Sequence, residues 1–180
     1  MLTGHKRFNT YLALAMAIAL VGGCQSPERV RKKAASTLRL HLEVKPDGTS
    51  FNSAVPIYRA APVMINVEKT AFVDESSVAE AKVTDTPGGF AIQIQFDQLG
   101  TRRLEEYSTA RKGSRFAVFS QFGDAAAQAR WLAAPLVSHQ ITNGVFVFTP
   151  DATREEAERM VLGLNNVARE VKKHTHEFSR

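Results

Sequence analysis

The chain has 180 residues, of which 44% are hydrophobic and 23% charged, a composition typical of a globular protein with about one domain. Its formal net charge of +5 falls to +3 without residues 1–23, which carry two basic residues and no acidic ones. So small an excess of positive charge does not indicate a nucleic-acid-binding protein.

The start of the chain has the layout of a secretory signal peptide. A basic stretch with Lys6 and Arg7 precedes eleven uncharged residues, 11–21, and small residues ending at Gly23 stand before Cys24. A membrane-spanning helix needs roughly 20 apolar residues, so this run is too short for one. We expect cleavage between Gly23 and Cys24. An uncleaved membrane anchor and an ordinary secreted protein with a free thiol are the alternatives.

Cys24 is the only cysteine, so no disulfide can form within the chain. The stretch 20–24, LVGGC, resembles the lipobox of bacterial lipoproteins. The resemblance implies that Cys24 receives a diacylglyceryl group and that its new amino terminus is acylated, with palmitate among the chains. Several acyl chains anchor a protein stably, whereas one anchors it only marginally. An aspartate directly after the cysteine would favour retention in the inner membrane. Gln25 stands there instead, which favours an outer-membrane protein facing the periplasm. Apart from the covalent lipid, no cofactor is expected.

Residues 24–36 are predicted to be a tether between the lipid and a domain at 37–180. The tether contains four basic residues between Arg29 and Lys33 and has no apolar face. It is either a solvated linker or a segment that lies on anionic lipid headgroups.

Residues 37–44 alternate between apolar and polar side chains, which is typical of a half-buried strand. We expect its leucines to face the core, and His41 to face the opposite side together with Arg39 and Glu43. Turn residues follow at 45–50, KPDGTS.

The next predicted elements are a strand at 62–69 and one or two helical turns at 74–81, with Asp74 as the N-cap. The strongest local pattern is at 79–96, where a Pro-Gly-Gly turn joins two strands. The apolar face of this hairpin is expected to cover the core, and its glutamines, among them Gln95, to face water.

Asp97 is expected to cap a helix that runs to about Lys112, followed by Gly113 in the left-handed conformation. A core strand is predicted at 115–120. Residues 121–128 are predicted to be a loop.

Residues 129–149 predict a pair of strands joined by a two-residue turn at Asn143-Gly144. Thr153 and Glu156 form a capping box that opens a long amphipathic helix. Gly163 lies near the middle of this helix and costs ~1 kcal/mol relative to alanine unless close packing requires it. The order of elements indicates an α+β fold: a mostly antiparallel sheet with two main helices packed on one face.

The ordered pieces from Thr37 to about Asn166 resemble the head of the first periplasmic domain of SecD and SecDF, accessory subunits of the bacterial protein-translocation machinery. The resemblance implies a head-like module of the kind thought to meet the emerging chain. The pieces that carry it are STLRLHLEV, FVDESSVAEAKV, FAIQIQFDQLGTRRLEEYS, RFAVFS, RWLAAPLV and ITNGVFVFTPDATREEAERMVLGL.

This sequence departs from the SecD and SecDF pattern in four ways. The turn after the third strand is expanded to SQFGDAAAQ, and the last helix runs on to about Lys173. The base subdomain and the transmembrane bundle of the family are not expected here. Because the membrane helices couple those proteins to the proton gradient, we expect no motor function.

No catalytic constellation is found: the sequence has no Gly-x-Ser-x-Gly elbow, phosphate-binding loop or His-Glu-x-x-His motif. His139 is expected on a surface strand near the Asn143-Gly144 turn. His174 and His176 near the C-terminus make a poor metal site. The pairs 105–106 and 155–156 are adjacent glutamates, which diverge on a helix and are expected to be solvated. The chain is therefore predicted not to be an enzyme and to hold no metal.

The predicted function is that of a lipid-anchored, non-catalytic periplasmic protein that binds exported polypeptides or an envelope protein, with sheet-edge pairing as the means. Gln95, Phe122 and Trp131 are the candidate polypeptide contacts, and Trp131 is alternatively a core residue. The alternative functions are an unrecognised hydrolase and a homo-oligomeric scaffold lipoprotein of the envelope. The scaffold would use a helix–helix seam of Val161, Leu164, Val171 and Phe178.

Overall fold

A computed structural model describes residues 34–123 and 128–178 of the chain. The predicted signal peptide, its cleavage site and Cys24 lie outside these residues. Among the described residues, no helix combines the length and the hydropathy that a membrane span requires.

The strands form three antiparallel sheets, one with four strands, one with two and one with three. The strands are β1 Arg39–Leu42, β2 Asn52–Ile57, β3 Val63–Glu68, β4 Val73–Asp74, β5 Val78–Thr86, β6 Gly89–Phe96, β7 Phe116–Phe122, β8 Gln128–Ala133 and β9 Val145–Phe148. Their orders are β4-β1-β7-β8, β2-β3 and β5-β6-β9. The helices are the 3-10 turn η1 Glu75–Ser77, α3 Gln98–Ala110 and α4 Arg154–Phe178. The α+β fold class is confirmed, with the strands divided over three sheets.

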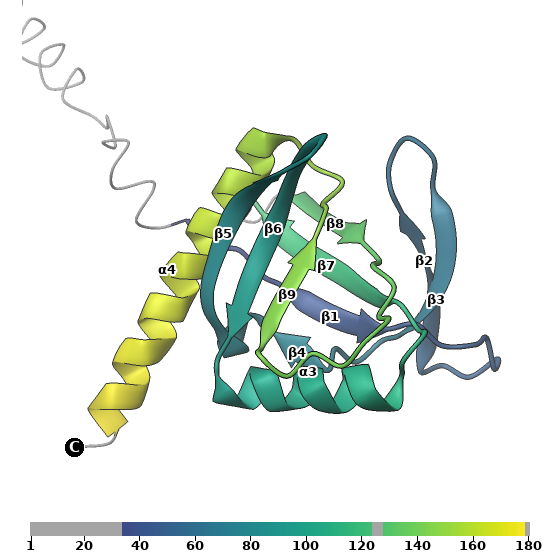
Figure 1. Cartoon of the computed structure of the whole chain (residues 1–180), viewed down its shortest axis with the longest axis horizontal. Coiled ribbons are helices and arrows are strands. Elements are labelled where there is room, and N and C mark those ends of the chain that lie inside the picture. The colour runs from purple at the N-terminus through teal and green to yellow at the C-terminus, as the bar shows by residue number, and fades with distance from the viewer. Residues whose placement is uncertain (1–33, 124–127, 179–180) are drawn as a thin grey trace, which may run out of the picture. The chain divides into compact units, whose positions relative to one another are not determined.

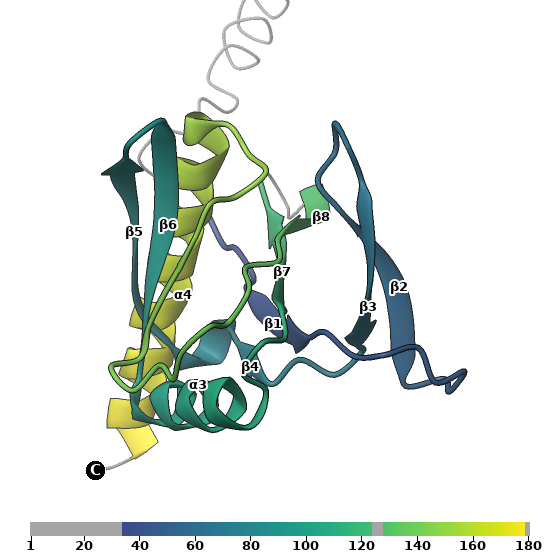
Figure 2. The same cartoon turned by 45° about the vertical axis from the view of Figure 1, so that its right-hand side comes forward.

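The three sheets are arranged as successive layers (Figures 1 and 2). The β5-β6-β9 sheet faces the four-stranded sheet, and the β2–β3 hairpin lies on the far side of the four-stranded sheet. Helix α4 runs along β5, and α3 lies across one end of the layers. The four-stranded sheet is therefore covered on both faces, and the main helices pack at the margins of the layers.

The main core fills the space between the β5-β6-β9 sheet and the four-stranded sheet. Its largest side chains are fully buried and come from both sheets and both main helices. They confirm the predicted inward faces of residues 37–44, of the hairpin at 79–96 and of both helices. Examples are Leu40, Ile94, Leu104, Phe116 and Met160.

A second apolar cluster, the hairpin core, lies beneath β2–β3. It consists of Val55, Ile57, Ile65, Val67, Ala117 and Ala134, with Trp131 packed against it. His41 faces the side opposite the leucines, as expected, but this side is covered: the residue is only 7% exposed because the hairpin lies over it. The His41 ring lies 4.9 Å from that of Trp131, and its Nδ1 lies 2.8 Å from the carbonyl oxygen of Glu68.

Strand β2 was not predicted, and it contains Pro56. Lys69 N donates to the carbonyl oxygen of Phe51 at 2.9 Å, and Pro56 stands opposite Met64 in the register. Hydrogen-bonded residues alternate along an antiparallel strand, so this register directs the nitrogen of Pro56 to the outer edge. A proline at such a position removes no ladder hydrogen bond.

The predicted strand pair at 129–149 is wrong in its partners. Strand β8 pairs with β7, where Trp131 lies opposite Phe119, and β9 pairs with β6, where Phe146 lies opposite Ile94. Gly144 does adopt a positive φ of 67°, but the turn joins β9 to a segment without strands. The predicted loop at 121–128 is shorter than expected, because β7 continues to Phe122.

The predicted helix caps are confirmed. The Asp97 carboxylate accepts a hydrogen bond from Gly100 N at 2.8 Å, and Gly113 has a φ of +87°. Thr153 N donates to Glu156 Oε2 at 2.8 Å, and Glu156 N donates to Thr153 Oγ1 at 3.2 Å, as a capping box requires. The predicted helical turns at 74–81 shrink to η1, which Asp74 caps through a hydrogen bond from Ser76 N at 3.0 Å.

Gly163 is required by close packing. A Cβ at this position would lie 2.3 Å from the Ser36 hydroxyl oxygen. Ser36 is buried, and the carbonyl oxygen of Ala34 accepts a hydrogen bond from Asn166 Nδ2 at 2.8 Å. Residues 34–36 of the predicted tether are therefore docked on α4, and the folded domain begins earlier than expected.

Candidate functional site

The two edges of the β5-β6-β9 sheet differ, and the β5 edge is closed. Asn165 on α4 accepts a hydrogen bond from Ala81 N and donates one to Ala81 O, both at 2.8 Å. Lys172 Nζ donates to the carbonyl oxygen of Ala79 at 3.3 Å. These side chains occupy the positions that an added strand would take.

The other edge of this sheet is β9. Phe96 N donates to Gly144 O at 2.9 Å, and Ile94 lies opposite Phe146. Because paired residues alternate along an antiparallel strand, the backbone groups of Phe146 point toward β6, and those of Val147 point away from it. The β9 edge therefore presents the N–H and C=O of Val147 beside the surface described next.

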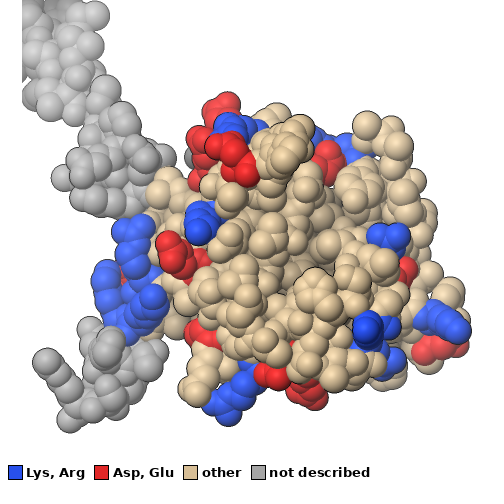
Figure 3. All heavy atoms as spheres, viewed as in Figure 1, with Lys and Arg blue, Asp and Glu red and all other residues tan. Residues whose placement is uncertain are grey.

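A cavity of about 430 Å³ adjoins the β9 edge and is lined by residues 135–143 and 145–147. Its volume is within the ~300–1,000 Å³ usual for ligand sites. Two exposed apolar side chains lie among the lining residues, Leu136 at 56% and Val147 at 49%. Figure 3 shows that the surface over β6 and β9 is largely uncharged, with charged side chains at its margins.

The start of β9 is held in place by contacts with β6 and α3. Gln95 Nε2 donates to Asn143 O at 3.2 Å and to Phe96 O at 3.1 Å. A Cβ on Gly144 would come within 2.0 Å of Thr101 Oγ1, so only glycine permits this approach to α3. The edge is therefore pre-organised, and Gln95 is a half-buried support for it, whereas we had expected it to face water.

The three predicted polypeptide contacts do not form one surface. Phe122 is fully buried, so its ring is inaccessible to a partner in this structure. Trp131 is half-buried and packs against His41 and against Phe119, whose ring centroid lies 5.2 Å away. Only Gln95 adjoins the β9 edge. Val147 and Leu136 were missed because their exposure depends on the pairing of β9 with β6, which no local pattern reveals.

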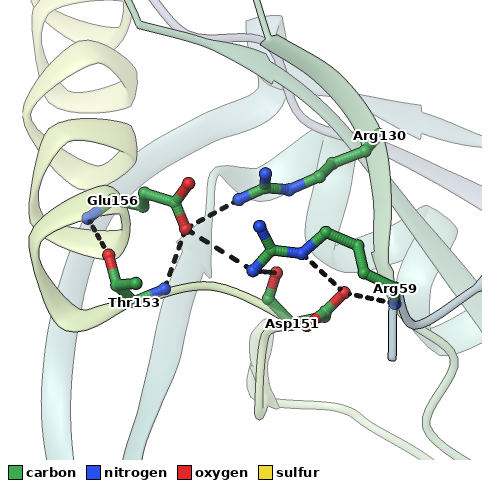
Figure 4. Close-up of polar contacts among 5 residues, drawn as sticks. All are labelled: Arg59, Arg130, Asp151, Thr153 and Glu156. Carbon is green, nitrogen blue, oxygen red and sulfur yellow. Dashed lines mark hydrogen bonds and ion pairs between the residues drawn. The ribbon is translucent and has the colours of Figure 1, made fainter. Parts of the chain in front are cut away.

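A polar network joins the β2–β3 loop, β8 and the start of α4 (Figure 4). Arg130 Nη2 lies 2.7 Å from Glu156 Oε2, and Arg59 Nε lies 3.2 Å from Asp151 Oδ2. Arg59 Nη2 is 3.9 Å from the same Glu156 oxygen, and Arg59 N donates to Asp151 Oδ2 at 2.7 Å. We call this network of Arg59, Arg130, Asp151 and Glu156 the clasp, because it joins the hairpin to the main body of the domain.

Glu156 is the buried member of this network, only 8% exposed, which corrects the expectation that residues 155–156 are both solvated. Burial raises the pKa of its carboxyl, but the close ion pair with Arg130, the hydrogen bond from Thr153 N–H and the charge of Arg59 outweigh burial. The net pKa lies below its ordinary value. A carboxylate held ionised by two arginines suits a structural clasp better than acid–base chemistry.

The remaining candidates show no arrangement for catalysis. His139 is exposed, as expected, but it lies outside any strand, and its Nδ1 is 3.1 Å from Ser138 Oγ. Within residues 34–123 and 128–174, no group of three His, Cys, Asp or Glu side chains is placed to hold a metal. His174 is exposed on α4, whereas the side chain of His176 lies outside the described residues.

Two residues of the predicted helix–helix seam are packed in the protein's own core. Leu164 is 2% exposed, and Val161 packs against the main core. The side chain of Phe178 lies outside the described residues.

Comparison with known proteins places this geometry in a family. The SecDF P1 head subdomain family matches residues 52–168, well over half of the chain. The chain belongs to this family. No curated protein matches the chain. The match to the SecDF head contains both edges of the β5-β6-β9 sheet, the cavity and the polar network, and it ends before the last turns of α4.

Two solved SecDF structures share the fold. One is SecDF described as a membrane component that enhances protein export, with a TM-score of 0.53 and 15% identity. The similarity covers 77% of this chain and 66% of that one, slightly less than two thirds. The other is SecDF in its super-membrane-facing form, also with a TM-score of 0.53 and 15% identity, covering 78% of this chain and 21% of that one.

Proposed function

We propose that this chain is a non-catalytic, lipid-anchored protein of the bacterial envelope that binds extended segments of exported polypeptides at the β9 edge. The observation that carries the proposal is that one edge of the β5-β6-β9 sheet is covered and the other is not. Asn165 and α4 occupy the β5 edge, while β9 directs backbone groups of Val147 away from its sheet beside a cavity. Membership of the SecDF head family supports a role in protein export.

The chemistry of the β9 edge suits polypeptides of varied sequence. A strand that adds to a sheet edge gains main-chain hydrogen bonds, which depend little on its side chains. Leu136 and Val147 supply apolar contact next to these bonds. The surface carries few charges, so it does not select for charged segments. A chain that has not yet folded exposes both the backbone and the apolar side chains that such an edge binds.

The lipid anchor is the second part of the proposal. Acylation of Cys24 would hold the domain at a membrane facing the periplasm, and Gln25 favours the outer membrane. The support for this part is the sequence LVGGC at 20–24 and the short uncharged run before it. Loss of membrane attachment in a Cys24→Ala chain, measured by fractionation, is the expected outcome.

The decisive test of the binding site uses Val147→Pro with Val147→Thr as its matched control. Proline removes the outward N–H without breaking the ladder to β6, and threonine keeps it. Loss of the hydrogen bond from this N–H to the bound polypeptide, together with the clash of the proline ring, should weaken binding. For an unfolded, fluorescently labelled export substrate we expect a loss of at least about tenfold. The threonine variant should stay within about twofold of the parent. Equal binding by all three proteins would contradict the site.

Photo-crosslinking in cells identifies the partner. A probe at Leu136, on the rim of the cavity, should form adducts with many exported chains, and a probe at exposed Lys112 should not. If one envelope protein dominates the adducts, the partner at this edge is that protein and not the exported chains. Adducts no stronger than those from Lys112 would contradict polypeptide binding at this edge.

A further inference from the structure

Positive charge is concentrated in two end segments of the chain. Residues 34–168 carry 13 basic and 15 acidic residues. Residues 24–33 carry four basic residues and one acidic residue, and residues 169–180 carry four basic and two acidic ones. The net positive charge that remains without residues 1–23 therefore comes from the two ends, and the body between them is slightly acidic.

The residues that directly follow the first basic segment, 34–36, pack on α4, the helix that carries the second. Ala34 O accepts a hydrogen bond from Asn166 on α4, and Ser36 packs against Gly163. The chain therefore enters the domain at the middle of α4, directly before the turns that begin at Arg169. Ala34, directly after the first basic segment, therefore contacts α4 three residues before the second basic segment begins.

The C-terminal half of α4 presents three exposed cations, Arg169, Lys172 and Lys173, which we call the α4 cationic surface. Figure 3 shows basic side chains gathered over this part of α4. Arg169 and Lys172 donate hydrogen bonds to uncharged oxygens, those of Asn165 and Asn166 and of Ala79. Lys173 pairs with Glu170 at 2.7 Å, so the surface remains net positive.

We propose that the α4 cationic surface binds an anionic phospholipid surface. Lys and Arg side chains next to anionic headgroups strengthen membrane binding by about fivefold each. Lipid is favoured over an acidic protein because Cys24 precedes Ala34 by only ten residues. At ~3.3 Å per extended residue, that stretch reaches at most about 33 Å. The acyl anchor, the four basic residues of 24–33 and the cationic surface would meet the same headgroups.

The contact would also orient the domain. Helix α4 covers the β5 edge, and β9 is at the opposite edge of the same sheet. A membrane against α4 therefore leaves the β9 edge directed away from the lipid, where a polypeptide can reach it. This orientation rests on the proposed polypeptide site, and the choice of lipid as the partner rests on the proposed acylation of Cys24.

The test uses the full chain with Cys24→Ser, so that acylation cannot cause the binding. Partition is measured by flotation on phosphatidylcholine vesicles with and without phosphatidylglycerol, at low and high salt. The parent should prefer the anionic vesicles and lose that preference in high salt, since screening shortens electrostatic range. Replacing Arg169, Lys172 and Lys173 by glutamine should lower the anionic preference roughly 10- to 100-fold. The neutral-vesicle value of each protein removes any contribution of residues 1–23 that does not depend on charge.

The matched control removes the same charge elsewhere, with Arg102, Arg111 and Lys112 changed to glutamine. These cations are also exposed. The control should keep the parent's preference within about threefold. An equal fall in both triple variants would show an effect of net charge alone and overturn the proposal. The proposal would also be overturned if the parent showed no preference for anionic vesicles and the α4 variant instead lost crosslinks to an acidic protein. The polypeptide assay with Val147→Pro is independent, so either proposal can fail alone.

Discussion

The main core and the hairpin core differ in what fills them. The main core is packed with Leu, Ile and Phe side chains from two sheets and both main helices. The hairpin core depends on four aliphatic side chains from β2 and β3 that lie on Ala117 of β7 and on Ala134, which directly follows β8. At the turn between β2 and β3, ion pairs among Arg59, Arg130, Asp151 and Glu156 join the hairpin to β8 and to the start of α4.

This difference implies two levels of stability. A two-stranded hairpin is at best marginally stable on its own, so β2–β3 depends on the small apolar contact and on the clasp. Segments with few buried contacts open at lower free energy than the rest of a protein. The hairpin should therefore open before the main core unfolds, exposing Trp131 and His41.

The largest effect is expected in the main core. Leu104→Ala removes a fully buried side chain from α3, and large-to-small changes at such sites lower the free energy of unfolding by about 2–5 kcal/mol. Leu99→Ala, on the same helix but 53% exposed, should change it by less than about 0.5 kcal/mol. Urea unfolding measures both. A similar loss for the two variants would mean that burial in α3 is not what stabilises the domain.

The hairpin core should respond locally. Ile57→Ala empties part of this cluster, and a loss of about 2 kcal/mol would speed amide exchange in β2 and β3 roughly 30-fold. Exchange in β5 and β6 should stay unchanged. Hydrogen exchange read by mass spectrometry separates the two regions. Equal acceleration in both would show that the hairpin is not an independent unit.

Removing the clasp should have a smaller effect. Glu156→Gln keeps the shape of the capping box but leaves Arg130 without its charged partner, which should cost about 1–2 kcal/mol of hairpin stability. Glu155→Gln is the matched control, because Glu155 is exposed in the same helical turn. Amide exchange in β2 and β3 is again the measurement, and an equal change in both variants would assign the effect to the helix dipole.

The clasp also predicts a pH dependence. Because the pKa of Glu156 is lower in the folded state, the unfolded chain takes up a proton first on acidification. The contribution of Glu156 is complete above its ordinary pKa and is lost as the pH falls through the lower folded value. Urea unfolding from pH 6 downward should show a smaller loss of stability in Glu156→Gln than in the parent and in Glu155→Gln.

The main core was largely predictable from sequence and the hairpin core was not. The faces of Leu40, Ile94 and Leu104 follow from local periods of two and 3.6 residues, which tertiary packing preserves. The hairpin core depends on which surface β2–β3 covers. Alternation marks His41 as polar-facing whether or not another layer lies over it, so its burial had no local signal.

The candidate site divides in the same way. Asp97, Thr153 and Gly144 were recognised because caps and turns are local chemistry. The free edge of β9 was missed, because its alternating residues fit β8 and β6 equally well as partners. The clasp was missed because Arg130 and Glu156 are distant in sequence, and an isolated charge on a strand or helix usually indicates a solvated face.

His41 gives the smallest expected effect and tests the comparison most directly. Burial under the hairpin lowers its pKa, with nearby Arg39 adding to the effect and the hydrogen bond to Glu68 opposing it. The unfolded chain therefore binds a proton first, and stability is lost as the pH falls below the ordinary value of 6.5. Between pH 7 and pH 5.5, above the range in which Glu156 titrates, β2 and β3 amides should lose protection while those of β5 and β6 do not. The loss should disappear in His41→Gln and persist in His139→Gln, whose parent side chain is exposed. An unchanged pH response in His41→Gln would mean that protonation elsewhere opens the hairpin, and the hairpin core would then not be the weak point assigned to it.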